Sequence, residues 1–153
     1  MAPFSLRTGA VIVVGAGFAG LTTALALSRC NPRPSIILIE QRTRFIFQPL
    51  LYELLSGELQ SWEVAPSYKS LLTAQGIVLI EDSVEMVNTL EQKVITSSGL
   101  SLKYSQVVLS TGSVPNTFAI SGACENALMF HSLTDVSRLR KVIHRLRSCN
   151  ESK

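Results

Sequence analysis

Residues 11–20, V-I-V-V-G-A-G-F-A-G, constrain the fold of this chain more than any other segment. An apolar β-branched run is typical of a buried strand, and it leads directly into G-x-G-x-x-G at Gly15, Gly17 and Gly20. The first glycine allows a sharp turn, the second leaves the backbone bare on one side, and the third lets a following helix pack close to a sheet. The segment therefore predicts a strand–turn–helix unit.

This turn is a candidate anion site, because the N–H groups at the start of a helix and its dipole attract a pyrophosphate. A second apolar run, Ile36–Ile39, ends at Glu40, twenty residues past Gly20. A carboxylate at this place can accept hydrogen bonds from a ribose hydroxyl, and it repels a 2′-phosphate. We therefore expect FAD or NAD rather than NADP, and we favour dinucleotide binding over a purely structural glycine-rich turn.

The same region has a second interpretation, because residues 8–28 contain no charge and Arg7 precedes them. An uncharged stretch of this length could span a membrane or belong to a signal peptide. The β-branched block at Val11–Val14, the three glycines and the lack of an A-x-A-like cleavage site argue against both. We therefore expect neither a signal peptide nor a transmembrane helix.

The composition is that of a globular domain, since 46% of the 153 residues are apolar and only 16% are charged. A net charge of +3 is too small to indicate nucleic-acid binding. Cys30, Cys124 and Cys149 are far apart and form no C-x-x-C motif, which favours reduced thiols in an intracellular protein. His131 and His144 have no ligand pattern around them, so we expect no metal site.

The remaining pattern predicts an α/β fold, a Rossmann-like domain with a parallel sheet and a small antiparallel β-meander inserted in it. The expected parallel strands are apolar, as is usual where helices cover a sheet: 11–14, 36–39, 77–80 and 106–110. The expected meander strands are short and separated by polar turns: 84–90, 93–97 and 100–104. The expected helices are 18–29, 66–72 and a final one after residue 132.

The final helix is predicted by a capping box and an apolar stripe, which comprise Ser132 with Asp135, and Val136, Leu139, Ile143 and Leu146. Its other face is basic and includes Arg138, Arg140, Lys141, His144, Arg145 and Arg147. Such a face could bind a membrane surface or a polyanion. We favour a solvated face whose cations complement the C-terminal end of the helix dipole.

The meander and the strand after it resemble the second fingerprint of flavoproteins with two dinucleotide-binding domains. The fingerprint reads V-V-L-S-T-G at residues 107–112. The resemblance implies that Thr111 and Gly112 close over the flavin nucleotide, Thr111 through its hydroxyl and Gly112 by allowing close backbone approach. The alternative is an ordinary strand-ending turn, which Thr-Gly often forms.

Residues 47–57 carry a more specific resemblance. Their pattern F-Q-P-L-L-Y-x-x-x-x-G resembles the type II NADH dehydrogenases, which are single-subunit flavin NADH:quinone oxidoreductases. The longer strings Y-E-L-L-S-G-E and W-E-V-A-P resemble the cyanobacterial and plastid branch of that family, which includes demethylphylloquinone reductases. The resemblance extends from residue 11 to the final helix.

The resemblance implies FAD-binding positions and no catalytic side chain: Gly15, Ala16, Gly17, Phe18, Ala19, Gly20, Glu40, Gln41, Gln48, Pro49, Leu50, Val84, Thr111 and Gly112. The glycine turn and Glu40 would bind the ADP half, and Val84 would meet the adenine through its backbone. Residues 48–50 would lie beside the isoalloxazine, where related disulfide reductases carry a cysteine pair. Arg44 and Phe45 stand where many members carry histidines, so the roles of those histidines do not transfer.

The implied reaction is hydride transfer from NADH or NADPH to the flavin, followed by reduction of a lipid quinone such as a phylloquinone precursor or plastoquinone. Such an enzyme would be cytoplasmic, or peripheral on the cytoplasmic or stromal face of a membrane. Two alternatives stay open. One is a sulfide- or carotenoid-handling relative, for which Cys124 alone is thin support. The other is a non-catalytic dinucleotide-binding module that acts with a partner chain.

Members of this family are considerably longer than 153 residues. They continue with a second G-x-G-x-x-G domain for NADH and with a segment that completes the FAD fold. The resemblance therefore implies that residues 1–153 are an incomplete N-terminal FAD-binding domain, without the NAD(P)H-binding domain. We expect weak or absent FAD retention by this chain alone, and no NADH oxidation.

Overall fold

The computed structural model describes residues 9–151, with side chains up to residue 148. These residues form two compact units. The first comprises residues 9–45 and 67–112, and the second comprises residues 46–66 and 113–151. Arg7 and the side chain of Cys149, which entered the sequence predictions, lie outside the described part of the chain.

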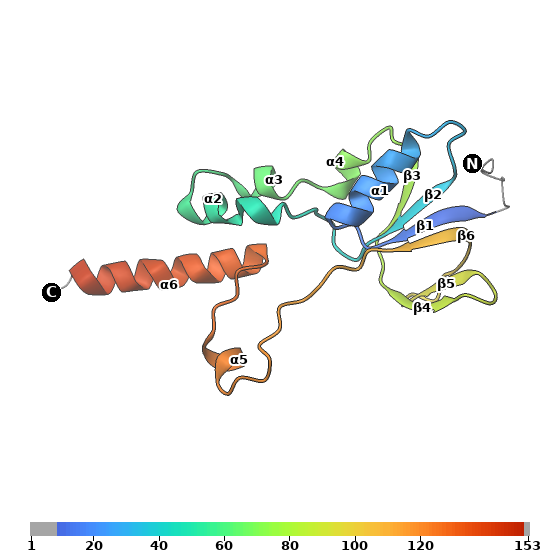
Figure 1. Ribbon diagram of the computed structural model, residues 1–153. Coiled ribbons are helices and arrows are strands. Elements are labelled where there is room, and N and C mark those ends of the chain that lie inside the picture. The colour runs from blue at the N-terminus through green and yellow to red at the C-terminus, as the bar shows by residue number, and fades with distance from the viewer. Residues whose placement is uncertain (1–8, 152–153) are drawn as a thin grey trace. The chain divides into compact units, whose positions relative to one another are not determined.

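The first unit is built on a sheet (Figure 1), whose strands within the described residues are β1 (Ala10–Val14), β2 (Ile36–Ile39), β3 (Ile77–Ile80), β4 (Val84–Asn88), β5 (Lys93–Thr96) and β6 (Ser101–Leu109). Their order in the sheet is β3-β2-β1-β6-β5-β4. β1 pairs in parallel with β2 and β6, and β2 pairs in parallel with β3. β5 pairs antiparallel with β4 and β6. The predicted α/β fold, with a parallel sheet and an antiparallel meander, is confirmed.

Strand β6 shows that the prediction of two separate strands, at 100–104 and 106–110, was wrong. One continuous strand pairs with β5 through its first residues and with β1 through the rest. The partners of Ala10 and Val11 are Tyr104 and Gln106, so Ser105 is the extra residue of a β-bulge. The Ser105 hydroxyl donates to the Ala10 carbonyl at 3.3 Å. Ser105, which separates two predicted strands in the sequence, is therefore a bulge within one strand.

Both faces of β1 and β2 are covered, which explains why these two strands are apolar throughout. Helix α1 (Phe18–Ser28) packs on one face, where it contacts Val13 of β1. Ile12 points to the opposite face and packs with Val94 and Tyr104 of the meander. Figure 1 shows α1 and the β4–β5 hairpin on opposite sides of β1. Strands β1 and β2 therefore have the helix on one face and the antiparallel strands on the other.

The helices of this unit begin and end close to the predicted residues. Helix α1 ends at Ser28, one residue before the predicted end, with Arg29 as its C-cap. Helix α4 (Tyr68–Leu71) is shorter than the predicted 66–72. Its N-cap is Ser67, whose Oγ accepts a hydrogen bond from Ser70 N at 3.1 Å. Because the serine caps the helix, the preceding proline lies outside it.

The second unit is helical, and its elements are η1 (Gln48–Leu50), α2 (Leu51–Ser56), α3 (Ser61–Val64), α5 (Ala123–Asn126) and α6 (Leu133–Glu151). The short helices between residues 48 and 64 were not predicted. They surround a small apolar core made of Leu51, Leu54, Val64 and Val136. Gly57, in the left-handed conformation at φ +93°, ends α2.

Helix α6 begins at the predicted capping box, which is confirmed. Ser132 N donates to Asp135 Oδ2 at 2.9 Å, and Asp135 N donates to Ser132 Oγ at 3.1 Å. The predicted apolar stripe is buried only at its start, since Val136 is 1% exposed and Leu146 is 61% exposed. At 1.5 Å per residue, α2 is about 9 Å long and α6 about 28 Å. The shorter helix is therefore too short to cover the whole of the longer one.

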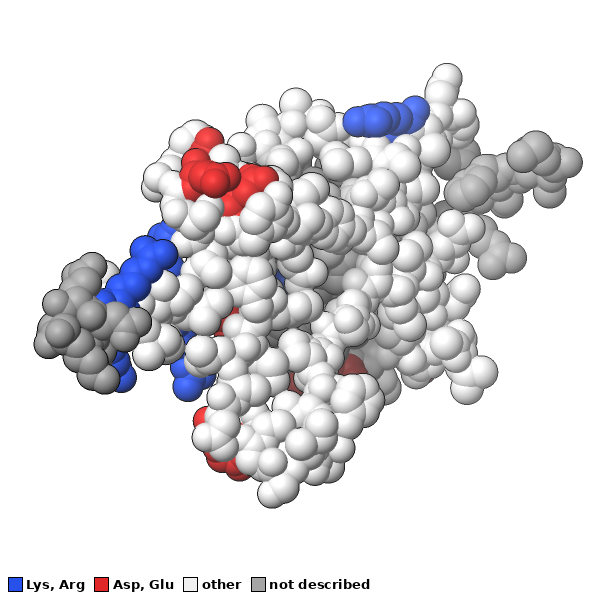
Figure 2. All heavy atoms as spheres, turned by 60° about the vertical axis from the view of Figure 1, so that its left-hand side comes forward, with Lys and Arg blue, Asp and Glu red and all other residues white. Residues whose placement is uncertain are grey.

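The basic residues of α6 are exposed: Arg138, Arg140, Lys141, His144, Arg145 and Arg147. Figure 2 shows one view of the molecule, in which the visible Lys and Arg side chains lie among other residues. Arg140 donates hydrogen bonds to the carbonyls of Leu54 and Leu55, and the solvated face stays a prediction. Within residues 9–151, no helix combines the length and the apolar character that crossing a membrane requires.

Candidate functional site

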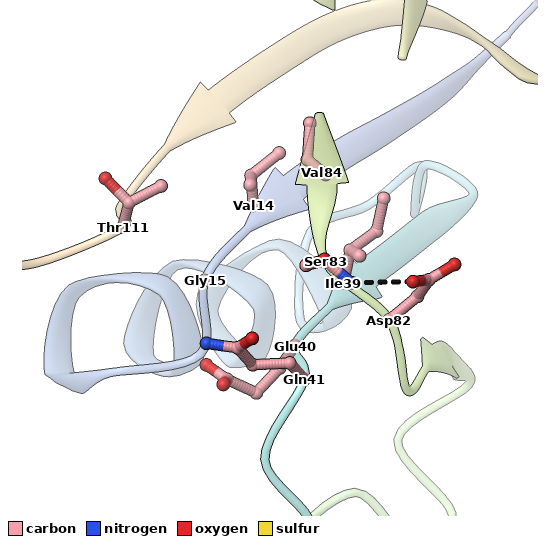
Figure 3. A pocket seen from close by; sticks show the side chains of 9 residues that line it. All are labelled: Val14, Gly15, Ile39, Glu40, Gln41, Asp82, Ser83, Val84 and Thr111. Carbon is pink, nitrogen blue, oxygen red and sulfur yellow. Dashed lines mark hydrogen bonds between the residues drawn. The ribbon is translucent and has the colours of Figure 1, made fainter. Parts of the chain in front are cut away.

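A pocket of about 200 Å³ opens at the carboxyl ends of the parallel strands (Figure 3). The residues that line it follow or end several strands of the first unit: Val14, Gly15, Ile39, Glu40, Gln41, Asp82, Ser83, Val84 and Thr111. β1 has β2 on one side and β6 on the other, so the chain reverses its direction of strand addition here. Such a switch point is where open α/β sheets bind their ligands.

The structure gives different reasons for glycine at the three positions of the turn. Gly15 has φ +86°, and a Cβ there would lie 2.5 Å from the Ser110 carbonyl oxygen. A Cβ on Gly20 would lie 1.8 Å from the Gly15 carbonyl oxygen. The fold itself therefore requires both of these glycines, because the strands and the helix approach too closely for a side chain.

Gly17 is different, because the fold does not require a glycine at this position. Its backbone has φ −64° and ψ −165°, which any residue can adopt. No atom of the described residues, neighbours aside, lies within 4 Å of a Cβ built on it. The bare backbone at Gly17 therefore faces open space.

Gly17 is also the N-cap of α1, and no hydrogen bond from a described side chain caps this helix. The first turn contains no acidic residue. The first N–H groups of a helix have no carbonyl partner within the helix, and they carry the positive end of its dipole. The start of α1 thus combines a positive helix end with open space over one residue.

Glu40 is only 5% exposed and is held by several donors. Its Oε2 accepts hydrogen bonds from Ala16 N at 2.8 Å and from Arg42 Nη2 at 3.0 Å. Its Oε1 accepts from Arg42 Nε at 2.9 Å and from Arg42 N at 3.0 Å. Burial raises the pKa of Glu40, but the hydrogen bonds from Arg42 and Ala16 outweigh it and hold the pKa below its ordinary value. The carboxylate is therefore charged and fixed at the edge of the pocket.

Val84 is placed by a hydrogen-bond network that the sequence analysis missed. Asp82 accepts from Ser83 N at 2.8 Å, from Ser97 Oγ at 2.6 Å and from Ser98 Oγ at 2.5 Å. These bonds, from Ser97 first, hold the pKa of Asp82 well below its usual range. The network joins the start of β4 to the turn after β5, and it holds the backbone next to Val84. Hydroxyls 15 and 16 residues away in sequence could be assigned to Asp82 only from the fold.

The structure brings most of the predicted positions together at one edge of the sheet. Gly15, Glu40, Gln41, Val84 and Thr111 line the pocket. Ala16, Gly17, Phe18, Ala19 and Gly20 form the adjoining turn and the start of α1, and Gly112 follows Thr111 at φ +76°. Gln48, Pro49 and Leu50 form η1 in the second unit, where Gln48 Nε2 lies 2.9 Å from His131 Nε2. Their roles toward a cofactor stay predictions.

The fold and the switch-point pocket define an α/β protein with a Rossmann-like parallel sheet and an antiparallel meander. Residues 9–149 match the family model of the pyridine nucleotide-disulphide oxidoreductases. The chain belongs to this family.

Relatives within the family agree with the resemblance to type II NADH dehydrogenases. The chain is 34% identical to an alternative NAD(P)H-ubiquinone oxidoreductase C1 of Arabidopsis thaliana, over 92% of this chain and 30% of that protein. It is 32% identical to the demethylphylloquinone reductase NdbB of Synechocystis, over 94% of this chain and 37% of that protein. The chain thus spans about a third of the length of the relatives it matches.

A solved structure shows the same fold. The sulfide:quinone oxidoreductase of Aquifex aeolicus superposes with a TM-score of 0.80 at 26% identity. The match covers 92% of this chain and 32% of that structure. The described fold therefore corresponds to about a third of that structure.

Proposed function

We propose that this chain is the FAD-binding N-terminal part of a flavin-dependent NAD(P)H:quinone oxidoreductase. The observation that carries the proposal is Gly17, where the fold tolerates a side chain but the sequence has none. Open space over the N-cap of α1 is what a pyrophosphate needs in order to reach the first N–H groups of the helix. A purely structural turn requires only the glycines at positions 15 and 20.

The residues around the pocket fit the ADP half of FAD. The start of α1, with Gly17 and Phe18, would hold the pyrophosphate. Glu40 would accept a hydrogen bond from a ribose hydroxyl in place of one that Arg42 now donates, since Arg42 and Ala16 together occupy the roughly four acceptor sites of the carboxylate. The Val84 backbone would meet the adenine, and Thr111 and Gly112 would lie toward the flavin. When bound, the flavin supplies the chemistry, by accepting a hydride and passing two electrons on.

The electron acceptor in this proposal is a lipid quinone, and a phylloquinone precursor is the preferred candidate. The support is the similarity to the Synechocystis protein named demethylphylloquinone reductase. Residues 48–50 of η1 offer proline and leucine rather than cysteine, which suits an apolar acceptor beside the flavin. The complete protein would work peripherally on the cytoplasmic or stromal face of a membrane, with NADH or NADPH as donor.

Two experiments test the proposal at different levels. Flavin-fluorescence titration of the 153-residue chain should show saturable FAD binding that ADP displaces, even if FAD does not survive purification. If the chain binds neither FAD nor ADP, the FAD assignment is refuted. A polypeptide of the relatives' full length that contains this chain should reduce a quinone with NADH or NADPH. If it binds FAD tightly but oxidises neither, the catalytic assignment fails and a partner-dependent module is the better account.

Sulfide oxidation is the second candidate, favoured by the likeness to the Aquifex sulfide:quinone oxidoreductase. Cysteine positions argue against it. Cys30 and Cys124 are exposed free thiols, and Cys30 lies just after α1, at the end opposite the glycine turn. Sulfide-dependent quinone reduction by the full-length polypeptide, without any NADH-dependent reaction, would reverse our preference.

A further inference from the structure

We propose that Tyr68 is a positioning residue for the bound dinucleotide: its hydroxyl, together with the Glu40 carboxylate, clamps Ala16 and so fixes the direction of the glycine-rich turn. The inference rests on the proposed function, because it concerns how the same pocket is held ready for its ligand. It assigns a role to a residue that is not among the predicted cofactor contacts.

The geometry of the clamp is simple. The Tyr68 hydroxyl donates to the carbonyl oxygen of Ala16 at 2.8 Å, and Ala16 N donates to Glu40 Oε2 at 2.8 Å. Ala16 and Tyr68 are both fully buried. The residue between the first two glycines is therefore bonded through both of its backbone groups to side chains that are remote in sequence.

A planar peptide bond turns this contact into a constraint on the helix start. The carbonyl of Ala16 and the N–H of Gly17 belong to one trans peptide unit and point in opposite directions. A bond from Tyr68 to the carbonyl therefore directs the Gly17 N–H away from the core. The preceding peptide is fixed too, because the Gly15 carbonyl accepts from Ser110 Oγ at 2.8 Å. Two successive peptide units of the turn are thus held before any ligand arrives.

Tyr68 can exert this control because its ring cannot move easily. The ring packs edge-on against Phe45, with centroids 6.5 Å apart, and Phe45 packs edge-on against Phe18, with centroids 5.1 Å apart. The Tyr68 N–H donates to the Thr43 carbonyl at 3.1 Å. Dense packing of this kind transmits position from one side chain to the next. The aromatic chain therefore links Tyr68 to the first residue of α1.

The hydroxyl at position 68 has no packing purpose. Phenylalanine would fill the same space, and burying a hydroxyl costs free energy unless it is hydrogen-bonded. Burial, and then the charge of Glu40, raises the pKa of Tyr68 to about 12. The hydroxyl is consequently a proton donor throughout the physiological pH range, so its hydrogen bond to Ala16 does not change with pH in that range.

The test compares two tyrosine-to-phenylalanine substitutions in the same unit. Tyr68→Phe removes the clamp and leaves the buried Ala16 carbonyl without its tyrosine donor. Tyr104→Phe is the matched control, since Tyr104 is also buried but its hydroxyl contacts the Asn88 carbonyl at 3.5 Å, away from the turn. We expect Tyr68→Phe to weaken FAD and ADP binding about tenfold and Tyr104→Phe to leave both unchanged. Equal affinity of Tyr68→Phe and the wild type would overturn the proposal.

Amide NMR signals of the ligand-free chain separate this proposal from the proposed function. In Tyr68→Phe the signals of residues 16–19 should shift, whereas in Tyr104→Phe they should not. If the wild type binds neither FAD nor ADP, the proposed function fails. The clamp is then judged from the amide signals of residues 16–19 in Tyr68→Phe: shifted signals support it, and unmoved signals refute it. If Tyr68→Phe does not fold, the exchange rate of the Tyr68 hydroxyl proton in the wild type tests the clamp instead. A slowly exchanging Tyr68 hydroxyl proton near Ala16 supports the clamp, and a fast-exchanging one overturns it.

Discussion

Replacing Gly17 with serine should make the protein more stable and a poorer FAD binder at the same time. The N-cap position is occupied by glycine with an extended backbone, and no described atom other than its chain neighbours lies within 4 Å of a new Cβ. Serine is the better N-cap by a few tenths of a kcal/mol. It also has less freedom in the unfolded chain, which adds about 0.4–1 kcal/mol. The free energy of unfolding should therefore rise by about 1 kcal/mol.

The same side chain would stand where the pyrophosphate approaches. Its hydroxyl would also accept a hydrogen bond from an N–H of the first helical turn, and that N–H would then be lost to the ligand. Loss of one hydrogen bond to a charged group costs about 1.5–3 kcal/mol. The dissociation constant for FAD should therefore rise about ten- to a hundredfold.

Urea unfolding and flavin-fluorescence titration measure the two effects on the same samples. Ala26→Ser is the matched control, because Ala26 is exposed near the far end of α1 and the same hydroxyl there cannot reach the turn. The control should bind FAD as the wild type does. Wild-type FAD affinity in Gly17→Ser would refute the argument that open space over Gly17 serves a ligand.

Three further substitutions test the fold and the site. Gly20→Ala should destabilise the chain by more than about 3 kcal/mol in urea unfolding, because its Cβ would lie 1.8 Å from the Gly15 carbonyl oxygen. A loss below about 1 kcal/mol would contradict this close packing. Glu40→Gln should be less stable than the wild type above about pH 4.5, the ordinary pKa of this carboxyl. The difference in stability should shrink as the pH falls, because a lowered native pKa contributes stability that protonation removes. A difference that is constant with pH would argue against the ion pair with Arg42. Val136→Ala should cost about 2 kcal/mol and Leu146→Ala less than about 0.5 kcal/mol, because only the former is buried; equal thermal shifts would show that α6 packs along its whole length.

β1 and β2 could be predicted from the sequence because burial on both faces makes them continuously apolar, and β3 is equally apolar although Val78 is exposed. β2 and β3 have the predicted bounds, and β1 begins one residue earlier. The strand break predicted near Ser105 was wrong, because Ser105 is a bulge within one strand. In the sequence, a polar residue between apolar ones looks the same at a bulge as at the end of a strand. Helices of four or six residues, such as α2 and α3, are too short to show a helical period. Their stability comes from packing around Leu51 and Val64.

The site was predictable where its chemistry is local and not where it depends on remote contacts. The turn at Gly15 to Gly20 forms within one strand–helix unit, so its spacing is visible in the sequence. The partners of Glu40 and Asp82 are not, and the Tyr68 contact joins residues 52 positions apart. Spacing identified Glu40 at the pocket but not Asp82, and the fold was needed to show what holds each of them.

The most direct test of the central claim is to map FAD binding on the isotope-labelled 153-residue chain by amide NMR. The account predicts saturable shifts at residues 15–20, 40–41, 84 and 111–112, and ADP should reproduce the shifts near the glycine turn. It also predicts displacement of FAD by ADP. Shifts that leave the glycine turn untouched, or no shift with either ligand, would contradict the assignment of this pocket to the dinucleotide.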